Sequence, residues 1–107
     1  MDGPSERLQA TVRRDASTIV LCIAGELDVA TEQDLTRLLT STADEHPGLL
    51  VIDLAEVTFI SPRAIAELGA IGDRVTTRII NAPPGAVRVA EILGIGHLFR
   101  DRHTNRP

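Results

Sequence analysis

The chain contains no lysine, tryptophan or tyrosine, and these absences exclude several kinds of function. All 11 basic residues are arginine, so a P-loop lysine, a Schiff-base lysine and a lysine general base are excluded. Phe59 and Phe99 are the whole aromatic content, which is too little for a base-stacking platform or an aromatic cage. The formal net charge of −4 argues further against nucleic acid as a partner.

Cysteine and long apolar runs are also scarce. Cys22 is the single cysteine, and it lies in the apolar run 19–23, which is typical of a buried strand in a reducing compartment. No apolar run approaches the roughly 20 residues that span a bilayer, and residues 1–7 are polar and lead into no signal-peptide core. We therefore expect a cytoplasmic protein without direct membrane insertion.

The 107 residues, of which 43% are hydrophobic, suffice for one domain. We expect this domain over residues 8–99, with a flexible N-terminus at 1–7 and a polar, frayed tail at 100–107. Hydrophobic patterning predicts the order β-β-α-β-α-β-α, which describes an α/β fold. Strands are expected at residues 8–12, 18–24, 49–54 and 78–81, and helices at 31–45, from Ser61 onward, and from the Pro83–Gly85 turn to Gly94.

Local signals add detail to this order. Residues 8–12 alternate apolar with polar, which predicts a half-exposed edge strand. The β-branched, nearly continuous run 18–24 predicts a strand covered on both faces. Thr31 with Asp34 resembles a capping box at a helix start. Ser61 followed by proline is typical of a helix start, with serine as the N-cap.

Nothing in the sequence points to catalysis. The three histidines, His46, His97 and His103, show no metal-ligand spacing to one another or to the cysteine. Ser17 and Ser61 lack the glycine-flanked context of a nucleophilic serine. We therefore predict no catalytic residue, no metal site and no cofactor, and hence a protein that is not an enzyme.

Several segments together resemble the STAS domain, in the branch of bacterial anti-sigma factor antagonists. The resemblance extends over about residues 8–99. It rests on residues 25–28 (Gly-Glu-Leu-Asp), 31–39, 50–54, 57–60 (Val-Thr-Phe-Ile), 81–84 (Asn-Ala-Pro-Pro) and 91–94 (Glu-Ile-Leu-Gly). It implies a small mixed sheet of four to five strands with three to four helices packed on one side.

The resemblance also implies a function in transcription regulation through protein–protein interaction. Members of this branch dock on a kinase-like anti-sigma factor of the serine-kinase type and thereby free a sigma factor. Their switch is phosphorylation of a serine at the start of the helix that here begins at Ser61, in the pattern Asp-Ser-Ser-Gly or Asp-Ser-Thr-Gly. The added dianion blocks docking.

This chain departs from that pattern at all four positions. Ser61 stands where the family has aspartate, Pro62 at the first serine, Arg63 at the phosphorylated residue and Ala64 at the glycine. The motif is degenerate, and we expect the usual phosphoswitch to be absent. Ser61 is the remaining candidate for phosphorylation, but an N-cap serine before proline is a poor acceptor. Arg63 has two interpretations: a contact for a carboxylate or anion, or a solvated surface residue.

The expected partner-binding surface combines the end of the second strand with this helix start. Asp28 matches an aspartate of the family there, although a cap for the following helix explains Asp28 equally well. The predicted contacts are Asp28, Thr58, Ser61, Pro62, Arg63 and Glu67. Alternatives are an accessory STAS subunit of a membrane transporter complex, a small-anion or nucleotide sensor, and a homodimer that pairs through the edge strand at residues 8–12.

Overall fold

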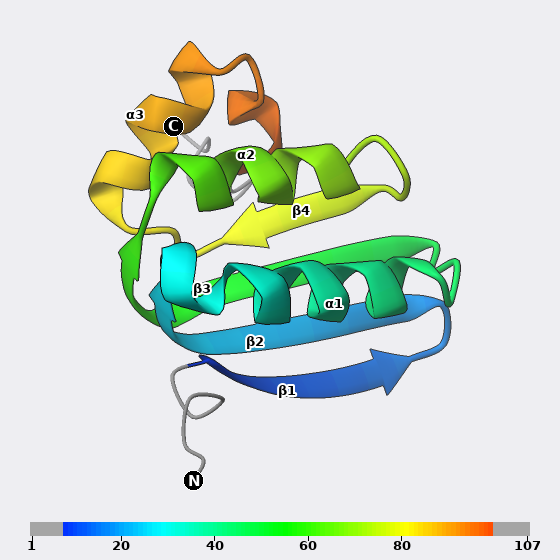
Figure 1. Ribbon diagram of the computed structural model, residues 1–107. Helices are drawn as coiled ribbons and strands as arrows, with labels where there is room; N and C mark the ends of the chain where they lie inside the picture. The colour runs from blue at the N-terminus through cyan, green and yellow to red at the C-terminus, as the bar shows by residue number, and fades with distance from the viewer. Residues whose placement is uncertain (1–7, 100–107) are drawn as a thin grey trace, which may run out of the picture.

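The computed structural model describes residues 8–99, so the predictions for residues 1–7 and 100–107 lie outside the described part. One sheet carries α1 and α2 on the same face, and α3 lies beside α2 at the β4 edge of the sheet (Figure 1). In chain order the elements are β1 (Leu8–Asp15), β2 (Thr18–Leu27), the 3₁₀ helix η2 (Val29–Thr31), α1 (Glu32–Ala43), β3 (Leu49–Ile60), α2 (Pro62–Ile71), β4 (Thr77–Ile80), α3 (Pro84–Ile92) and the 3₁₀ helix η3 (Gly96–Phe99).

The sheet is mixed, with the strand order β1-β2-β3-β4. β1 runs antiparallel to β2, whereas β2, β3 and β4 are parallel to one another. Parallel neighbours need a crossover, and α1 and α2 supply the two crossovers. The expected α/β class is confirmed, with four strands in the mixed sheet and three α-helices in the described part of the chain.

The two central strands are covered on one face only. In β2 the side chains of Leu21 and Ile23 are fully buried beneath the helices, and the side chains that alternate with them, including Val20 and Cys22, are only partly buried. β3 shows the same alternation between residues 49 and 54. The prediction that residues 18–24 are covered on both faces is therefore wrong, and Cys22 is a half-buried free thiol rather than a buried one. The run is continuous because the open face also carries β-branched and apolar side chains.

β1 is an edge strand, as predicted, but it is longer and more exposed than its pattern suggests. It continues to Asp15, and a two-residue turn with Ala16 at φ 55° joins it to β2. Seven of its eight residues are exposed, and only Leu8 is partly buried. The half-exposed prediction fails because α1 lies over β2 and β3 and leaves β1 uncovered (Figure 1).

β3 extends six residues past the predicted end at Leu54. The extension pairs with the second half of β2 through two irregularities in register, one of them at Gly25, whose φ is 113°. The backbone N–H of Ser61 then donates to the carbonyl of Leu27 at 2.9 Å. This pairing brings the last residues of β2 and β3, and the helices that follow them, to the same place.

Two glycines, Gly69 in α2 and Gly72 just after it, allow the segment after α3 to approach closely. A Cβ at Gly72 would lie 2.8 Å from Cδ1 of Leu98, and a Cβ at Gly69 would overlap the side chain of Ile95. The segment after α3 can therefore pack closely on α2, and it buries Leu98 and Phe99 in the core. Gly94, at φ 82°, ends α3 as predicted.

Candidate functional site

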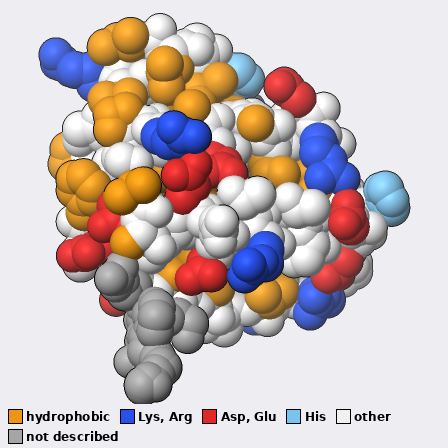
Figure 2. All heavy atoms as spheres, viewed as in Figure 1, with side chains coloured by type: hydrophobic (Ala, Val, Ile, Leu, Met, Phe, Trp, Pro, Cys, Tyr) orange, Lys and Arg blue, Asp and Glu red, His pale blue; other side chains and the backbone are white. Residues whose placement is uncertain are grey.

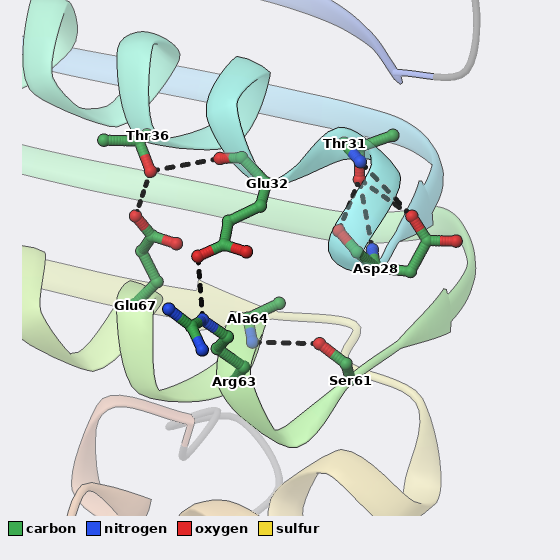
Figure 3. Close-up of polar contacts among 8 residues, drawn as sticks. All are labelled: Asp28, Thr31, Glu32, Thr36, Ser61, Arg63, Ala64 and Glu67. Carbon is green, nitrogen blue, oxygen red and sulfur yellow. Dashed lines mark hydrogen bonds and ion pairs between the residues drawn. The ribbon is translucent and has the colours of Figure 1, made fainter.

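The starts of α1 and α2 lie side by side (Figures 1 and 3). α1 follows β2 by way of η2, and α2 follows β3 directly. Because β2 and β3 are parallel and paired up to Leu27 and Ile60, both chains leave the sheet at the same edge. In open α/β sheets the carboxyl ends of the strands are the usual place for binding sites.

A capping box closes the start of η2, but not the predicted one. Oδ1 of Asp28 accepts from the backbone N–H groups of Ala30 at 3.0 Å and Thr31 at 3.3 Å, and the N–H of Asp28 donates to Oγ1 of Thr31 at 3.1 Å. Thr31 makes no side-chain cap bond to α1, so the predicted pairing with Asp34 is wrong. The extra 3₁₀ turn moves the cap three residues upstream. The interpretation of Asp28 as a cap is confirmed.

Ser61 is the N-cap of α2, as predicted. Its Oγ accepts from the N–H of Ala64 at 3.1 Å, and Pro62 occupies the first helical position. The first turn of α2 contains no acidic residue and instead carries Arg63. A cation there is opposed by the helix dipole, which favours negative charge at a helix start.

Glu32 of α1 supplies the negative charge that α2 lacks. Its Oε2 accepts from Nε of Arg63 at 2.7 Å, with the arginine side chain 78% exposed and the glutamate 30% exposed. Among residues 8–99 the guanidinium has no other side-chain partner, so its two terminal nitrogens make no side-chain hydrogen bond there. One turn further along, the hydroxyl of Thr36 donates to the carboxylate of Glu67 (Figure 3). Two polar contacts thus join α1 to α2.

A hollow of about 150 Å³ lies between the two helix starts. Its lining residues are Asp28, Val29, Glu32, Leu35, Ser61, Arg63, Ala64 and Glu67. Three carboxylates and one guanidinium give this lining a formal net charge of −2. Figure 2 shows acidic side chains next to a basic one in the middle of this face. Val29 adds an apolar side chain that is 83% exposed.

The structure brings together four of the six predicted contact residues, Asp28, Ser61, Arg63 and Glu67. Thr58 and Pro62 are exposed but do not line the hollow, and the Thr58 hydroxyl donates to the carbonyl of Gly25 at 3.3 Å. Sequence reasoning missed Val29, Glu32, Leu35 and Ala64. Glu32 in the first turn of a helix resembles any acidic residue that complements a helix dipole, so its sequence position gave no signal for an ion pair with α2.

The start of α2 offers few groups to an anion. Pro62 has no N–H, the N–H of Ala64 is bonded to Ser61, and the N–H of Ile65 already donates to the carbonyl of Ser61 at 3.0 Å. Helix starts bind phosphate through such free N–H groups. Three carboxylates nearby oppose an anion as well. The arrangement is suited to contacts with a protein surface rather than to enclosing a phosphate.

Residues 8–99 contain no group of three or more histidine, cysteine, aspartate or glutamate side chains placed to hold a metal ion. Within the same range, no helix has both the length and the apolar character needed to cross a bilayer.

Comparison with known proteins identifies the family. A family model for the STAS domain matches residues 8–105, and the chain therefore belongs to the STAS family. A search of curated proteins found no match.

Solved structures agree with this assignment. An anti-sigma factor antagonist from Mycobacterium paratuberculosis matches with a TM-score of 0.75 and 22% identity, covering 86% of this chain and 82% of that one. The unphosphorylated anti-sigma factor antagonist SpoIIAA matches at 0.66 with 16% identity, covering 90% and 92%. A variant of RsbS from Moorella thermoacetica matches at 0.56 with 15% identity, covering 89% and 81%. At these identities the likeness is one of fold, and the recognised STAS fold is confirmed.

Proposed function

We propose that this protein is an anti-sigma factor antagonist that acts in the bacterial cytoplasm. It docks on a kinase-like anti-sigma factor and frees a sigma factor for transcription. Membership of the STAS family supports this proposal, as does the fold shared with structures that are described as anti-sigma factor antagonists. A small hollow between two helix starts, with the side chains of Val29 and Arg63 exposed at it, suits a protein partner.

One observation carries the finer part of the proposal, that docking is not controlled by the usual phosphoswitch. In the resemblance to the family, Arg63 occupies the position of the phosphorylated serine, and an arginine offers no hydroxyl to a kinase. The hydroxyl of Ser61 is engaged as the helix cap. Glu32 accepts a hydrogen bond from Nε of Arg63 at the hollow, and the terminal nitrogens of Arg63 have no side-chain partner among residues 8–99. Phosphorylation therefore adds no charge at position 63, and we expect partner binding to follow protein concentration.

The geometry favours this role over the sensor alternative. A small anion or nucleotide would need donors, whereas the hollow carries three carboxylates and few free N–H groups. No observation specifically favours an accessory transporter subunit. In that alternative the same surface would dock on an ATPase subunit, so the identity of the bound protein separates the two roles.

The test is capture of the partner from a lysate of the source cells, followed by binding measurements with the purified pair. Arg63→Glu reverses the central charge and should weaken binding by about tenfold or more, because like charges then meet within the contact. Arg88→Glu is the matched control, since Arg88 is exposed on α3, away from the hollow, and makes the same change in net charge. Equal affinity of both variants would contradict the proposed surface. Capture of a transporter ATPase would contradict the proposed role.

The missing phosphoswitch has its own test. The purified chain is incubated with the captured anti-sigma factor and ATP, and intact-mass spectrometry follows the addition of phosphate. We expect none. Phosphate on wild-type protein that disappears in Ser61→Ala would show that Ser61 has taken over the acceptor role, and it would contradict this part of the proposal.

A further inference from the structure

The outer edge of β1 is a second surface that nothing in the site uses. β1 pairs with β2 along all eight residues without a register shift. Its other edge has no strand partner within residues 8–99. Proteins protect such edges with proline, a bulge, a very short strand, charged side chains or a covering segment. β1 is eight residues long with no proline and no bulge, and its charged residues, Arg13, Arg14 and Asp15, are confined to its last three positions. Within residues 8–99 the backbone groups of residues 8–12 on this edge have no strand partner.

We propose that β1 pairs antiparallel with β1 of a second copy of this chain, across a two-fold axis normal to the sheet. Such an axis keeps the helices of both copies on the same side of one continuous eight-stranded sheet. Residues directly opposite each other on two paired strands point to the same face of the sheet. The axis must therefore pass between one residue and the same residue of the second copy. The strand must therefore be compatible with itself in one of a few registers.

Val12 is the residue that we place at the axis. It is 36% exposed, and in this register it packs on its own copy. Gln9 then lies opposite Asp15 of the second copy, an amide facing a carboxylate, and Arg13 lies opposite Thr11. Centring the strand on Arg13 would instead place two guanidinium groups directly opposite each other, which is destabilising. Centring it on Thr11 leaves Asp15 without a partner and places Leu8 opposite Arg14.

The neighbouring ion pair is compatible with this pairing. Arg14 makes two hydrogen bonds to Glu45 just beyond α1, at 2.9 Å and 2.6 Å. Its charge is thus partly neutralised on the helix-bearing side of the sheet. An edge contact of this length is small compared with the roughly 1,200 to 2,000 Å² of stable complexes, so the dimer should be weak and dependent on concentration.

Sedimentation velocity over a range of protein concentrations tests the pairing. The wild type should shift from monomer toward dimer between about 5 μM and about 500 μM, as expected for a small interface. Val12→Glu places two carboxylates at the axis and should raise the dissociation constant by about tenfold or more. Ile92→Glu is the control and should leave it unchanged, because Ile92 is exposed at the end of α3 and lies neither on β1 nor at the hollow. A wild type that stays monomeric throughout, or a dimer that Val12→Glu does not weaken, would overturn the proposal.

Cross-linking tests the register independently of dimer strength. In a Cys22→Ser background, which removes the native thiol, Val12→Cys should form a disulfide-linked dimer with diamide as oxidant. Cysteines at the axis are close enough to bond, whereas Gln9→Cys faces Asp15 of the second copy and should react about tenfold or more slowly. Faster cross-linking through Thr11→Cys would overturn the register. Equal rates at positions 9 and 12 would overturn the ordered pairing. Circular dichroism checks that each variant is folded.

Discussion

The two helix starts at the site differ in how their free N–H groups are capped and how their helix dipoles are compensated. Upstream of α1, Asp28 and Thr31 form a closed capping box, and Glu32 and Asp34 in the first turn complement the helix dipole. At α2, one serine caps the helix, proline removes a donor, and the first turn carries an arginine. All the groups at the first start come from a few consecutive residues. The second start takes its missing negative charge from a residue 31 positions away.

The two helix starts therefore differ in their expected roles, which are stability at the first and partner binding at the second. The polar groups before α1 are mostly hydrogen-bonded within the fold, and Thr31 is only 1% exposed. Those of α2 are exposed and only partly engaged, with the Arg63 side chain 78% exposed. Substitution of Thr31 before α1 should therefore affect mainly stability, and substitution of Arg63 at the start of α2 should affect mainly binding.

The largest stability effect is expected at Thr31. Thr31→Val removes the oxygen that accepts from the N–H of Asp28 and donates to the carbonyl of Glu26 at 2.7 Å. Leaving these groups unpaired should lower the free energy of unfolding by about 2 kcal/mol, measured by urea denaturation. Thr36→Val makes the same change at an exposed position and should cost much less. Equal losses in both variants would show that the buried hydroxyl of Thr31 contributes no more to stability than an exposed one.

Ser61 should come next. Ser61→Ala deletes the cap of α2 and should cost about 1 kcal/mol in the same assay. Ser61→Asp retains a capping oxygen and should remain close to the wild type. If Ser61→Asp instead weakens partner binding while its stability is kept, Ser61 takes part in the contact as well as in the cap.

The ion pair between the helices should contribute least to stability. Both side chains are partly exposed, so a double-mutant cycle with Glu32→Gln and Arg63→Gln should give a coupling energy of about 0.5 kcal/mol or less, decreasing further in salt. Partner affinity should nevertheless fall in Arg63→Gln. A coupling energy well above 1 kcal/mol would show that the pair stabilises the fold substantially. It would then contradict the proposal that Arg63 serves mainly in binding.

A second exposed ion pair, between Arg14 and Glu45, should contribute to stability in a way that depends on pH. Arg14 lowers the pKa of Glu45 below its ordinary value of 4.5, chiefly through their hydrogen bond. The stabilisation is therefore present above the ordinary pKa and is lost as the pH falls through the lowered one. Arg14→Gln should reduce stability slightly at neutral pH and not at all in acid, whereas partner binding should not change. A fall in affinity would extend the docking surface beyond the hollow.

Much of the fold could be predicted from the sequence, because local signals and pairing agree there. The strand positions, the α2 start at Ser61 and Pro62 and the end of α3 at Gly94 all follow from short patterns. The continuation of β3 to Ile60 did not, since it depends on pairing with β2 through irregular register. The exposure of β1 depends on where the helices lie, and alternation within one strand carries no information about that.

The site was predictable only where the resemblance pointed to it. Positions 61 and 63 could be located along the chain, but the contact of Arg63 with Glu32 arises from the packing of α1 on α2. Thr58 and Pro62 were predicted because they are close in sequence to Arg63. The path of β3 into α2 leaves both outside the hollow.

The two-residue turn at Ala16 has a consequence for the order of folding. β1 and β2 can pair as soon as this turn closes, and hairpins form within about 1 to 10 μs. The pairing of β2 with β3 has to wait until residues 28–48 are brought together, and non-local parallel contacts form slowly. The hairpin therefore exists while its apolar face is still uncovered. Expression at high concentration should be most vulnerable to aggregation in that interval, before α1 covers Leu21 and Ile23.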